Sequence, residues 1–186
     1  MNHVFTVTTG FTVPDETVVY PFLNSKDIKS QLPWDLSEGA SLAVGEIAPV
    51  SHSKIHICPI VTLITWVIAG ELWITMKDPV SPEPYTVQLQ PEQAALTRPG
   101  TFLQHRNNQT VPCRVLYIVS PAHVFVVDEQ QAFTYDDAIV TDADWLTLAR
   151  QGWTIPEAAD LDRIHRDRAR ALHYLQTHKS QQPFGS

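Results

Sequence analysis

The chain has 186 residues, hydrophobic residues at 44% of its positions and a formal net charge of −7 at pH 7. This length fits one domain with extensions, and the apolar share is that of a soluble globular protein with a buried core. The acidic balance argues against a nucleic-acid-binding surface, because such a surface needs clustered Lys and Arg to displace counterions.

The N-terminal part predicts a short extension before the main domain. Residues 3–9 and 17–23 have the β-branched, alternating pattern of strands, and the polar stretch from 24 to 40 predicts a loop or short turn. The first twenty residues lack a basic segment followed by an apolar one, so we do not expect a signal peptide. We therefore assign residues 1–40 to an N-terminal extension of strands and loop.

The middle of the chain predicts an all-β domain, which we place at residues 41–135. Eight short β-like segments are separated by turn residues, at a spacing typical of a sandwich or barrel. They cover residues 41–50, 53–59, 62–70, 71–78, 85–91, 93–100, 102–108 and 113–121. The longest apolar run, around residues 60–70, is about half as long as a membrane span and contains two threonines, so we expect no membrane partner.

After residue 140 the apolar period becomes helical. Residues 141–152 predict one helix, with Thr141 or Asp142 as its N-cap and Gly152 as its stop. Residues 155–179 predict a second, amphipathic helix that packs on the barrel or on a partner. Its apolar face comprises Leu161, Ile164, Ala169, Leu172 and Leu175. The resulting divisions are a C-terminal helical segment at 136–180 and a disordered tail at 181–186.

Two motifs in the β domain resemble the signatures of the cupin superfamily. In residues 41–74, a strand carrying His56 is followed by an apolar strand and a turn at Gly70, as in the first cupin motif. Residues 92–118 resemble the second motif. The matching positions are Gly100 and Asn107 or Asn108. The resemblance implies an all-β, cupin-type double-stranded β-helix (jelly-roll) barrel, here with an N-terminal extension and two C-terminal α-helices. It also implies a homodimer, because cupins commonly pair through their sheets.

The metal-binding positions of these motifs are largely replaced. In metal-binding cupins, two His and one Glu from the first motif and one His from the second converge inside the barrel. The corresponding positions here hold His56, Cys58, Thr62 or Leu63, and Leu103 or Gln104. We favour a protein without a cofactor, because a metal site normally needs three or more correctly aimed ligands. The alternative is a substitute site for Fe, Zn, Ni or Cu built from His56, Cys58 and His105.

Without a metal, the barrel interior is expected to be a mostly apolar small-molecule site with a few polar groups. The candidate ligand-binding residues are Cys58, Thr62, Thr65, Gln104 and His105. By analogy with metal-free cupin epimerases, His56 is the candidate general base and Tyr117 the candidate acid. Cys58 is also a candidate nucleophile beside His56, since a neighbouring imidazole lowers the pKa of a thiol. We expect His52 on the same face of the strand as His56.

Three hypotheses for the function follow. The one we favour is an enzyme that acts on a small molecule inside the barrel, as an isomerase, cyclase or lyase, or as an oxygenase if a metal is bound. The second is a non-catalytic metabolite-binding barrel, and the third is a structural cupin whose interior is filled by its own side chains. The sequence does not name a ligand.

The cysteine content bears on the cellular setting. Cys58 and Cys113 are too few for a disulfide framework, which predicts a reducing, cytoplasmic setting. A single bridge between the two residues is left open by the sequence.

Overall fold

The computed structural model describes residues 7, 9–23, 39–130 and 132–178. The tail expected at 181–186, and all but the last two residues of the loop expected at 24–40, lie outside them. The strands are β1 (Phe11–Thr12), β2 (Val18–Leu23), β3 (Ser41–Ile47), β4 (Ser51–His52), β5 (Ile55–Ile57), β6 (Thr62–Ala69), β7 (Leu72–Lys77), β8 (Tyr85–Leu89), β9 (Ala94–Thr97), β10 (Phe102–Asn107), β11 (Cys113–Ser120), β12 (Phe125–Val127), β13 (Phe133–Asp136) and β14 (Ile139–Thr141).

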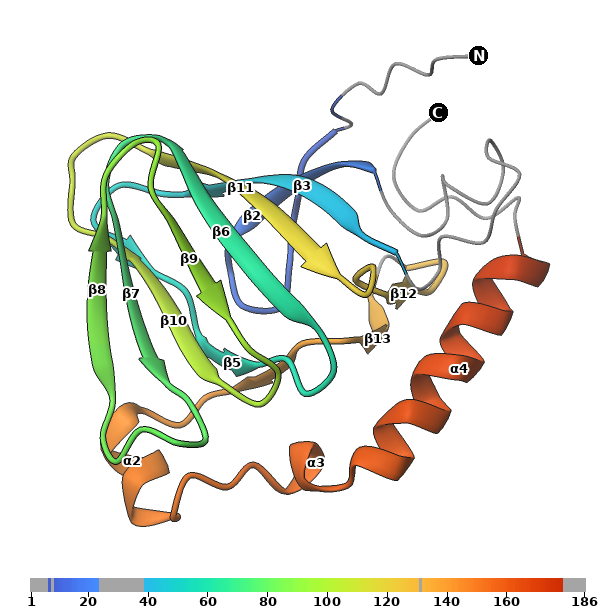
Figure 1. The fold of residues 1–186 in the computed structure, drawn as a ribbon. Coiled ribbons are helices and arrows are strands. Elements are labelled where there is room, and N and C mark those ends of the chain that lie inside the picture. The colour runs from blue at the N-terminus through green and yellow to red at the C-terminus, as the bar shows by residue number, and fades with distance from the viewer. Residues whose placement is uncertain (1–6, 8, 24–38, 131, 179–186) are drawn as a thin grey trace.

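Two antiparallel sheets form the body of the protein (Figure 1). Sheet A has the strand order β1-β2-β3-β11-β6-β9, and sheet B has the order β14-β5-β10-β7-β8, with β4 also paired to β10. A separate hairpin is formed by β12 and β13. Across the described residues the two sheets are joined by packing rather than by a continuous ring of hydrogen bonds. The all-β, double-stranded β-helix fold predicted from the sequence is therefore confirmed, as two facing sheets.

The main core lies between the two sheets because alternate side chains of each strand point inward. Val67 on β6 and Val115 on β11 come from sheet A, and Leu72, Ile74 and Leu103 come from sheet B. All five side chains are completely shielded from solvent. Burial of each such side chain contributes about 1.5–3 kcal/mol to folding, so the period-two pattern holds the sheets together.

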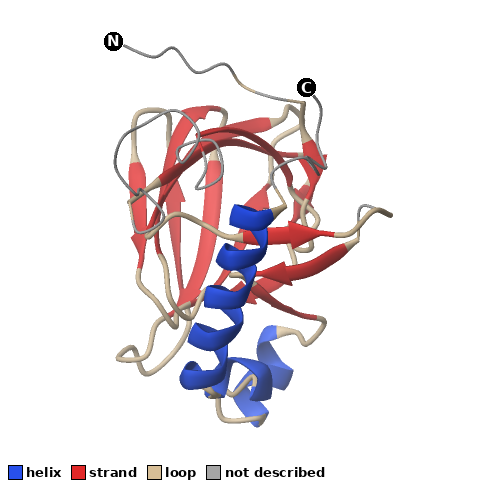
Figure 2. Cartoon of the chain, turned by 90° about the vertical axis from the view of Figure 1, so that its right-hand side faces the viewer, coloured by secondary structure: helices blue, strands red, loops and turns tan. Residues whose placement is uncertain are grey.

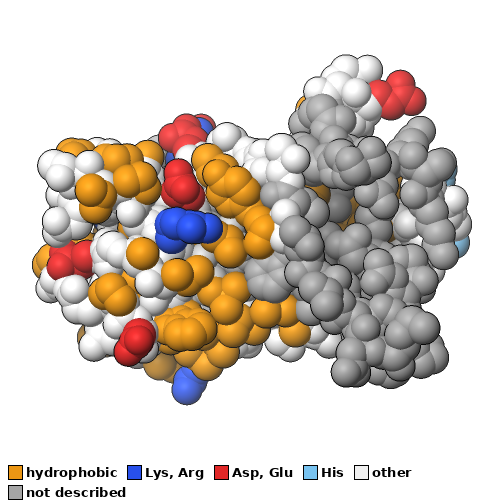
Figure 3. Space-filling model, turned by 90° about the horizontal axis from the view of Figure 1, so that it is seen from above, with side chains coloured by type: hydrophobic (Ala, Val, Ile, Leu, Met, Phe, Trp, Pro, Cys, Tyr) orange, Lys and Arg blue, Asp and Glu red, His pale blue; other side chains and the backbone are white. Residues whose placement is uncertain are grey.

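The outer face of sheet A is rich in exposed apolar side chains. Trp66 and Ile68 on β6 and Leu96 on β9 are 40%, 45% and 54% exposed. Figure 3, which views the molecule from above, shows hydrophobic side chains grouped over this side. No described helix contributes to the hydrophobic core on this face, because the helices form their clusters with sheet B and with β12–β13.

Between residues 132 and 178, the C-terminal region contains three helices, where the sequence predicted two. They are α2 (Trp145–Arg150), α3 (Pro156–Ala159) and α4 (Leu161–Thr177). The first begins later than predicted: Asp144, rather than Thr141 or Asp142, accepts a hydrogen bond from the Thr147 backbone N–H as its N-cap. Thr141 instead ends β14, which pairs with β5, so the helical segment begins after sheet B is complete and not at residue 136.

The second predicted helix is interrupted at Asp160. The Asp160 side chain accepts a hydrogen bond from the Arg163 backbone N–H at 2.9 Å and caps α4. A short acidic side chain competes in this way with the helical backbone. The non-helical backbone of Asp160, with φ −100° and ψ 83°, separates α3 from α4. None of the helices in the described part of the chain has both the length and the apolar character that a membrane span requires.

The helices cover two different parts of the β structure. Leu148 of α2 and Ile155, just before α3, pack on Ile57 and Phe102 at the outer face of sheet B. The longer helix α4 lies beside β12 and β13, at the side of the sheets (Figures 1 and 2). There, Arg168 of α4 donates through Nε to Asp137 Oδ2 at 3.1 Å, and both side chains are buried.

Candidate functional site

A cavity of about 130 Å³ lies between the two sheets, next to the β1–β2 hairpin and the β12–β13 hairpin. Most of its wall is apolar, with Val19, Leu63 and Val119 among the lining residues. Its polar lining includes Asp15, His56, His105, Tyr117, His123 and Asp136, together with the hydroxyl residues Thr17 and Ser41. The volume is close to that of engineered cavities of about 150 Å³ that bind benzene, so a single small molecule fits.

Four residues predicted from the sequence lie together around this cavity. His56 is on β5, His105 is on β10 and Tyr117 is on β11, while Cys58 directly follows β5. The rings of His56 and His105 are 6.0 Å apart between centroids, and those of His105 and Tyr117 are 5.7 Å apart. The interior that the sequence placed around His56 and Cys58 therefore exists.

Gln104 was expected in the interior and lies on the opposite face of β10. Its side chain donates to the Ser53 carbonyl at 2.8 Å and accepts from the Trp145 indole N–H at 2.9 Å, outside sheet B. Successive side chains on a strand alternate between faces, so an inward His105 requires an outward Gln104. The expectation for Gln104 is therefore corrected.

His52 also points outward, beside Gln104 rather than on the face of His56. Its Nδ1 lies 3.2 Å from the Gln104 amide nitrogen. The sequence suggested a single strand with even spacing, but β4 ends at His52 and β5 begins at Ile55. The two residues between these strands break the alternation on which the expectation rested.

The two threonines of β6 differ from each other. Thr65 faces the core and is completely buried, with its hydroxyl lacking a hydrogen-bond partner among the described residues. Thr62 has the opposite parity and is only partly buried. Neither lines the cavity, so the geometry does not bring these two candidate ligand-binding residues to the site.

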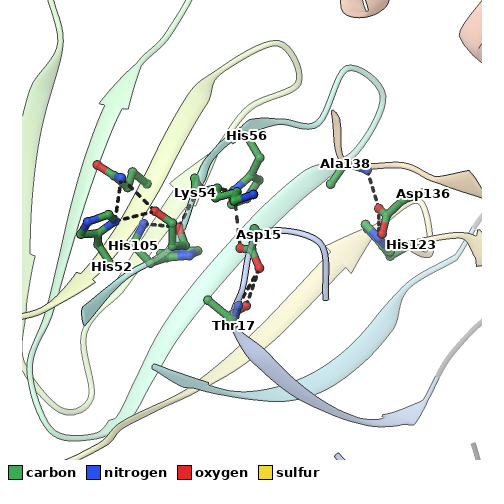
Figure 4. A network of polar contacts seen from close by, with 11 residues as sticks. Asp15, Thr17, His52, Lys54, His56, His105, His123, Asp136 and Ala138 are labelled. Carbon is green, nitrogen blue, oxygen red and sulfur yellow. Dashed lines mark hydrogen bonds and ion pairs between the residues drawn. The ribbon is translucent and has the colours of Figure 1, made fainter. Parts of the chain in front are cut away.

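Asp15 is a polar residue of the site that the sequence analysis missed. It precedes β2, is 7% exposed and accepts hydrogen bonds at Oδ1 from the Thr17 backbone N–H and hydroxyl at 3.0 and 2.8 Å. Its Oδ2 lies 3.5 Å from His56 Nδ1, and Figure 4 shows the two side chains pointing toward each other. The Asp15 carbonyl also accepts from the Lys54 backbone N–H, which fixes the hairpin to sheet B. The sequence feature that could have pointed to Asp15 is the Asp-x-Thr turn at residues 15–17.

His105 and Tyr117 are buried polar groups whose functional atoms have no partner in the described structure. Among the described residues, neither ring nitrogen of His105 forms a hydrogen bond. The Tyr117 hydroxyl does not form one either. His105 is only 2% exposed. An unsatisfied buried polar atom costs about 1–3 kcal/mol, and native proteins keep such atoms where function or a bound molecule compensates the cost.

The protonation states of these groups follow from their burial. Burial, reinforced by the neighbouring His56, lowers the pKa of His105 to about 4, so the ring is neutral at pH 7. Burial and the charge of Asp15 raise the pKa of Tyr117 well above 10. The nearby Thr17 hydroxyl, which donates to Asp15 rather than to Tyr117, offsets only part of this shift. The site therefore presents a neutral imidazole and a neutral phenol side by side.

Cys58 lines the cavity as a thiol rather than a thiolate. Burial raises its pKa far above the ordinary value of 9, and the negative charges of the nearby aspartates raise it further. A thiol needs a lowered pKa to act as a nucleophile at neutral pH, so the nucleophilic alternative for Cys58 is not supported. Cys58 and Cys113 are both free, so they do not form the bridge that the sequence left open.

His123 and Asp136 form a second pair at the cavity wall. His123 Nε2 lies 3.0 Å from Asp136 Oδ1, which also accepts from the Ala138 backbone N–H (Figure 4). Burial lowers the pKa of His123, but the charge and hydrogen bond of Asp136 outweigh it, so the net shift is upward. His123 was not among the candidates from the sequence, and Asp136 was expected to lie in a solvated turn.

The candidate metal ligands do not form a three-ligand centre. In the described parts of the chain, no group of three or more His, Cys, Asp or Glu side chains is arranged to hold an ion. His56 Nδ1 faces the Lys54 carbonyl at 3.2 Å and the Asp15 carboxylate. We therefore assign no chemical step to a metal.

No protein-family model matches this sequence, and no curated protein matches it. Solved structures do match. The cupin domain of Drosophila melanogaster CENP-C is 12% identical with a TM-score of 0.50, covering 61% of this chain and 70% of its own. KdgF from Halomonas sp. is 11% identical with a TM-score of 0.50, covering 65% and 94%. Oxalate decarboxylase of Lactobacillus farciminis is 12% identical with a TM-score of 0.52, covering 96% and 42%.

At these identities the three structures are informative about the fold alone. The chain they match has two facing antiparallel sheets. Its two sequence motifs also resemble the cupin signatures. The protein therefore has the fold of the cupin superfamily.

Proposed function

We propose that the protein binds a small, uncharged molecule in the cavity between the sheets and transfers protons to and from it. The observation that carries this proposal is the buried, unpartnered pair of His105 and Tyr117 beside the Asp15–His56 pair. Polar atoms that converge on an apolar cavity without a partner are typical of a small-molecule site.

The cavity limits the size and charge of its ligand. Its volume of 130 Å³ restricts the ligand to about the size of a substituted six-membered ring. Neither Lys nor Arg is among the described residues of its wall, whereas Asp15 and Asp136 both are. An anionic ligand would meet these carboxylates, and the His123 imidazole is already paired with Asp136, so a neutral carbonyl or hydroxyl compound fits best.

His56 is the proposed general base. Its Nδ1 lies within reach of the Lys54 carbonyl and Asp15, which favours the tautomer with the proton on Nδ1. This tautomer leaves Nε2 free to accept a proton from a carbon next to a ligand carbonyl. Asp15 is a positioning residue that stabilises the positive charge formed on His56.

Tyr117 is the proposed acid, and His105 lies between it and His56. When the C–H bond breaks, its electron pair forms a C=C bond to the carbonyl carbon, and the C=O π pair moves to the oxygen, where the Tyr117 hydroxyl donates a hydrogen bond to the developing negative charge. Return of the proton from His56 to the oxygen gives the enol, and return to the other face of the same carbon gives the stereoisomer, so neither step needs an oxidant. The neutral ring of His105 supplies a second hydrogen bond to the ligand.

The test is hydrogen–deuterium exchange of cyclohexanone in deuterated buffer, followed by NMR. We expect the wild-type protein to accelerate exchange at the carbons next to the carbonyl, and His56→Gln and Tyr117→Phe to slow it by about 10²-fold or more. His52→Gln, on the outer face, is the matched control and should exchange like the wild type.

Two outcomes decide against the catalytic proposal. Exchange that is equal in the wild type, His56→Gln and Tyr117→Phe would rule out proton transfer by these groups. Binding of cyclohexanone that protects the wild type against thermal unfolding, but without exchange, would favour the non-catalytic metabolite-binding alternative.

We also propose that two copies of the chain pair through the outer face of sheet A. Trp66, Ile68 and Leu96 supply the exposed apolar area. Arg114 and Glu46 are cross-strand partners on the same face, so a two-fold axis through it would bring opposite charges of the two copies together. Sedimentation of the wild type and of Trp66→Glu tests this: a dimer that Trp66→Glu converts to a monomer supports it, and a monomeric wild type refutes it.

A cytoplasmic setting is part of the same proposal. Both cysteines of the chain are free and buried, which suits a reducing compartment. Fractionation of cells expressing the protein from its own gene would test this compartment directly.

A further inference from the structure

A second cleft lies on the outer side of sheet B, next to α3 and the segment that joins it to α2. It has a volume of about 470 Å³, within the roughly 300–1,000 Å³ of small-molecule sites. Lys77, Asp78, Phe102, Trp153 and Ile155 are among its lining residues. It shares no lining residue with the cavity between the sheets, so it is a separate site.

Lys77 brings a poorly compensated positive charge to this cleft. The residue is 7% exposed, and its Nζ donates to the Asp78 backbone carbonyl at 2.9 Å. Within the described structure no carboxylate forms an ion pair with it. The carboxylate of Asp78 is engaged elsewhere, accepting from the backbone of Val80 and Ser81 and from the Tyr85 hydroxyl. A buried charge is costly unless an opposite charge accompanies it.

Trp153 forms the wall opposite this charge. Lys77 Nζ lies 5.4 Å from the centre of the Trp153 ring, at cation–π distance. The same ring packs edge-on against Phe102 at 6.1 Å. Trp153 has a φ of 59°, in the left-handed region that residues with large side chains rarely adopt. Its backbone N–H donates to the Leu148 carbonyl at 2.9 Å. The end of α2 therefore holds an indole ring over the ammonium group in a strained conformation.

We propose that this cleft binds a small organic carboxylate. The carboxylate pairs with the Lys77 ammonium, and the apolar body of the ligand packs on Trp153 and Ile155. The Lys77 ammonium separates this site from the inter-sheet cavity, whose described lining contains two carboxylates and neither Lys nor Arg. The Asp78 carboxylate in the cleft already accepts hydrogen bonds from Val80, Ser81 and Tyr85.

The first experiment uses the wild-type full-length protein labelled with ¹⁵N. Benzoate and its neutral isostere benzamide are titrated separately, and the Trp153 indole N–H, assigned with Trp153→Phe, is followed together with the backbone amides of Gly100 and Gly152. We expect saturable shifts of these signals with benzoate, and binding of benzamide weaker by about tenfold, which corresponds to about 1.4 kcal/mol. Absence of a saturable shift with benzoate, or equal affinity for benzamide, would overturn the proposal.

The second experiment uses charge variants of the two described lysines. Lys77→Met should lose benzoate binding, and Lys77→Arg should retain it. Lys54→Met is the matched control: it removes the same charge from an exposed side chain paired with Asp142 at 2.9 Å, and should bind benzoate like the wild type. Unchanged binding by a folded Lys77→Met would refute the role of Lys77. If that variant does not fold, the benzoate and benzamide comparison on the wild type decides.

Discussion

Asp15 Oδ2 lies 3.5 Å from His56 Nδ1, although 41 positions separate the two residues in the sequence. The contact joins the turn before β2, in sheet A, to β5, in sheet B. It places a carboxylate beside the proposed base and closes one side of the cavity. The stability and chemistry of the site therefore depend on how the N-terminal hairpin docks.

The first prediction concerns this carboxylate. Asp15→Asn should lower the free energy of unfolding by about 1–3 kcal/mol, because the buried carboxylate accepts two hydrogen bonds from Thr17 and faces His56. Glu16→Gln, which removes the neighbouring exposed charge, should have a much smaller effect. Urea unfolding measures both, and equal losses for the two variants would contradict the role given to Asp15.

The second prediction concerns the buried ion pair that attaches α4. Arg168→Leu should destabilise the protein by about 3–5 kcal/mol, since it leaves the buried Asp137 carboxylate without its charge partner. Arg163→Leu removes an exposed helix charge and should cost less than about 1 kcal/mol. Chemical denaturation of the two variants gives the comparison, and a mild effect of Arg168→Leu would mean that the pair is solvated.

The third prediction concerns the close approach of β3 to the Tyr117 ring. A Cβ at Gly45 would overlap that ring, so Gly45→Ala should destabilise the protein by about 1–3 kcal/mol and weaken ligand binding in the cavity. In a Tyr117→Ala background the overlap with the ring disappears and only the close contact with Val115 Cγ2 at 2.9 Å remains, so Gly45→Ala should then cost less than in the wild type. Thermal melts of the four proteins in this double-mutant cycle provide the measurement, and additive losses would count against the steric explanation.

The fourth prediction is a pH dependence caused by His105. Its pKa is about 4 in the folded protein and close to the ordinary 6.5 in the unfolded chain. Between these values the unfolded chain binds more protons, so stability rises with pH from 4 to 6.5 and falls as the solution is acidified. The contribution is at most about 3 kcal/mol. Unfolding free energies measured across this range should rise less steeply for His105→Phe than for the wild type, while His52→Gln should match the wild type.

The fifth prediction concerns the two thiols. Burial raises the pKa of Cys113 to about 11 and that of Cys58 further, so neither should react with a thiol reagent in the folded protein. A disulfide-forming dye should label both cysteines only after denaturation. Rapid labelling of Cys58 in the native protein would show that its side of the cavity opens.

Part of the site was predictable because strand geometry is local. The first motif and strand alternation placed His56 inside, and the parity of β10 allowed His105 to face inward. Tyr117 was chosen by analogy with metal-free cupin epimerases. The prediction for Gln104 failed because the alignment to the second motif was uncertain by one residue. A shift of one residue moves a side chain from the inner to the outer face of the sheet. The prediction for His52 failed because the break after β4 is not visible as a Gly or Pro in the sequence.

By itself, the sequence determined the all-β class, the cupin-type order of strands and the inward direction of the main site residues, since each follows from a period of two and from short motifs. Only the tertiary structure decided that Asp15 faces His56, that Asp160 divides the C-terminal helices, and that Lys77 lies under Trp153. These contacts join segments that are distant in sequence or choose between competing local conformations. Such choices depend on packing free energy, which no local pattern encodes.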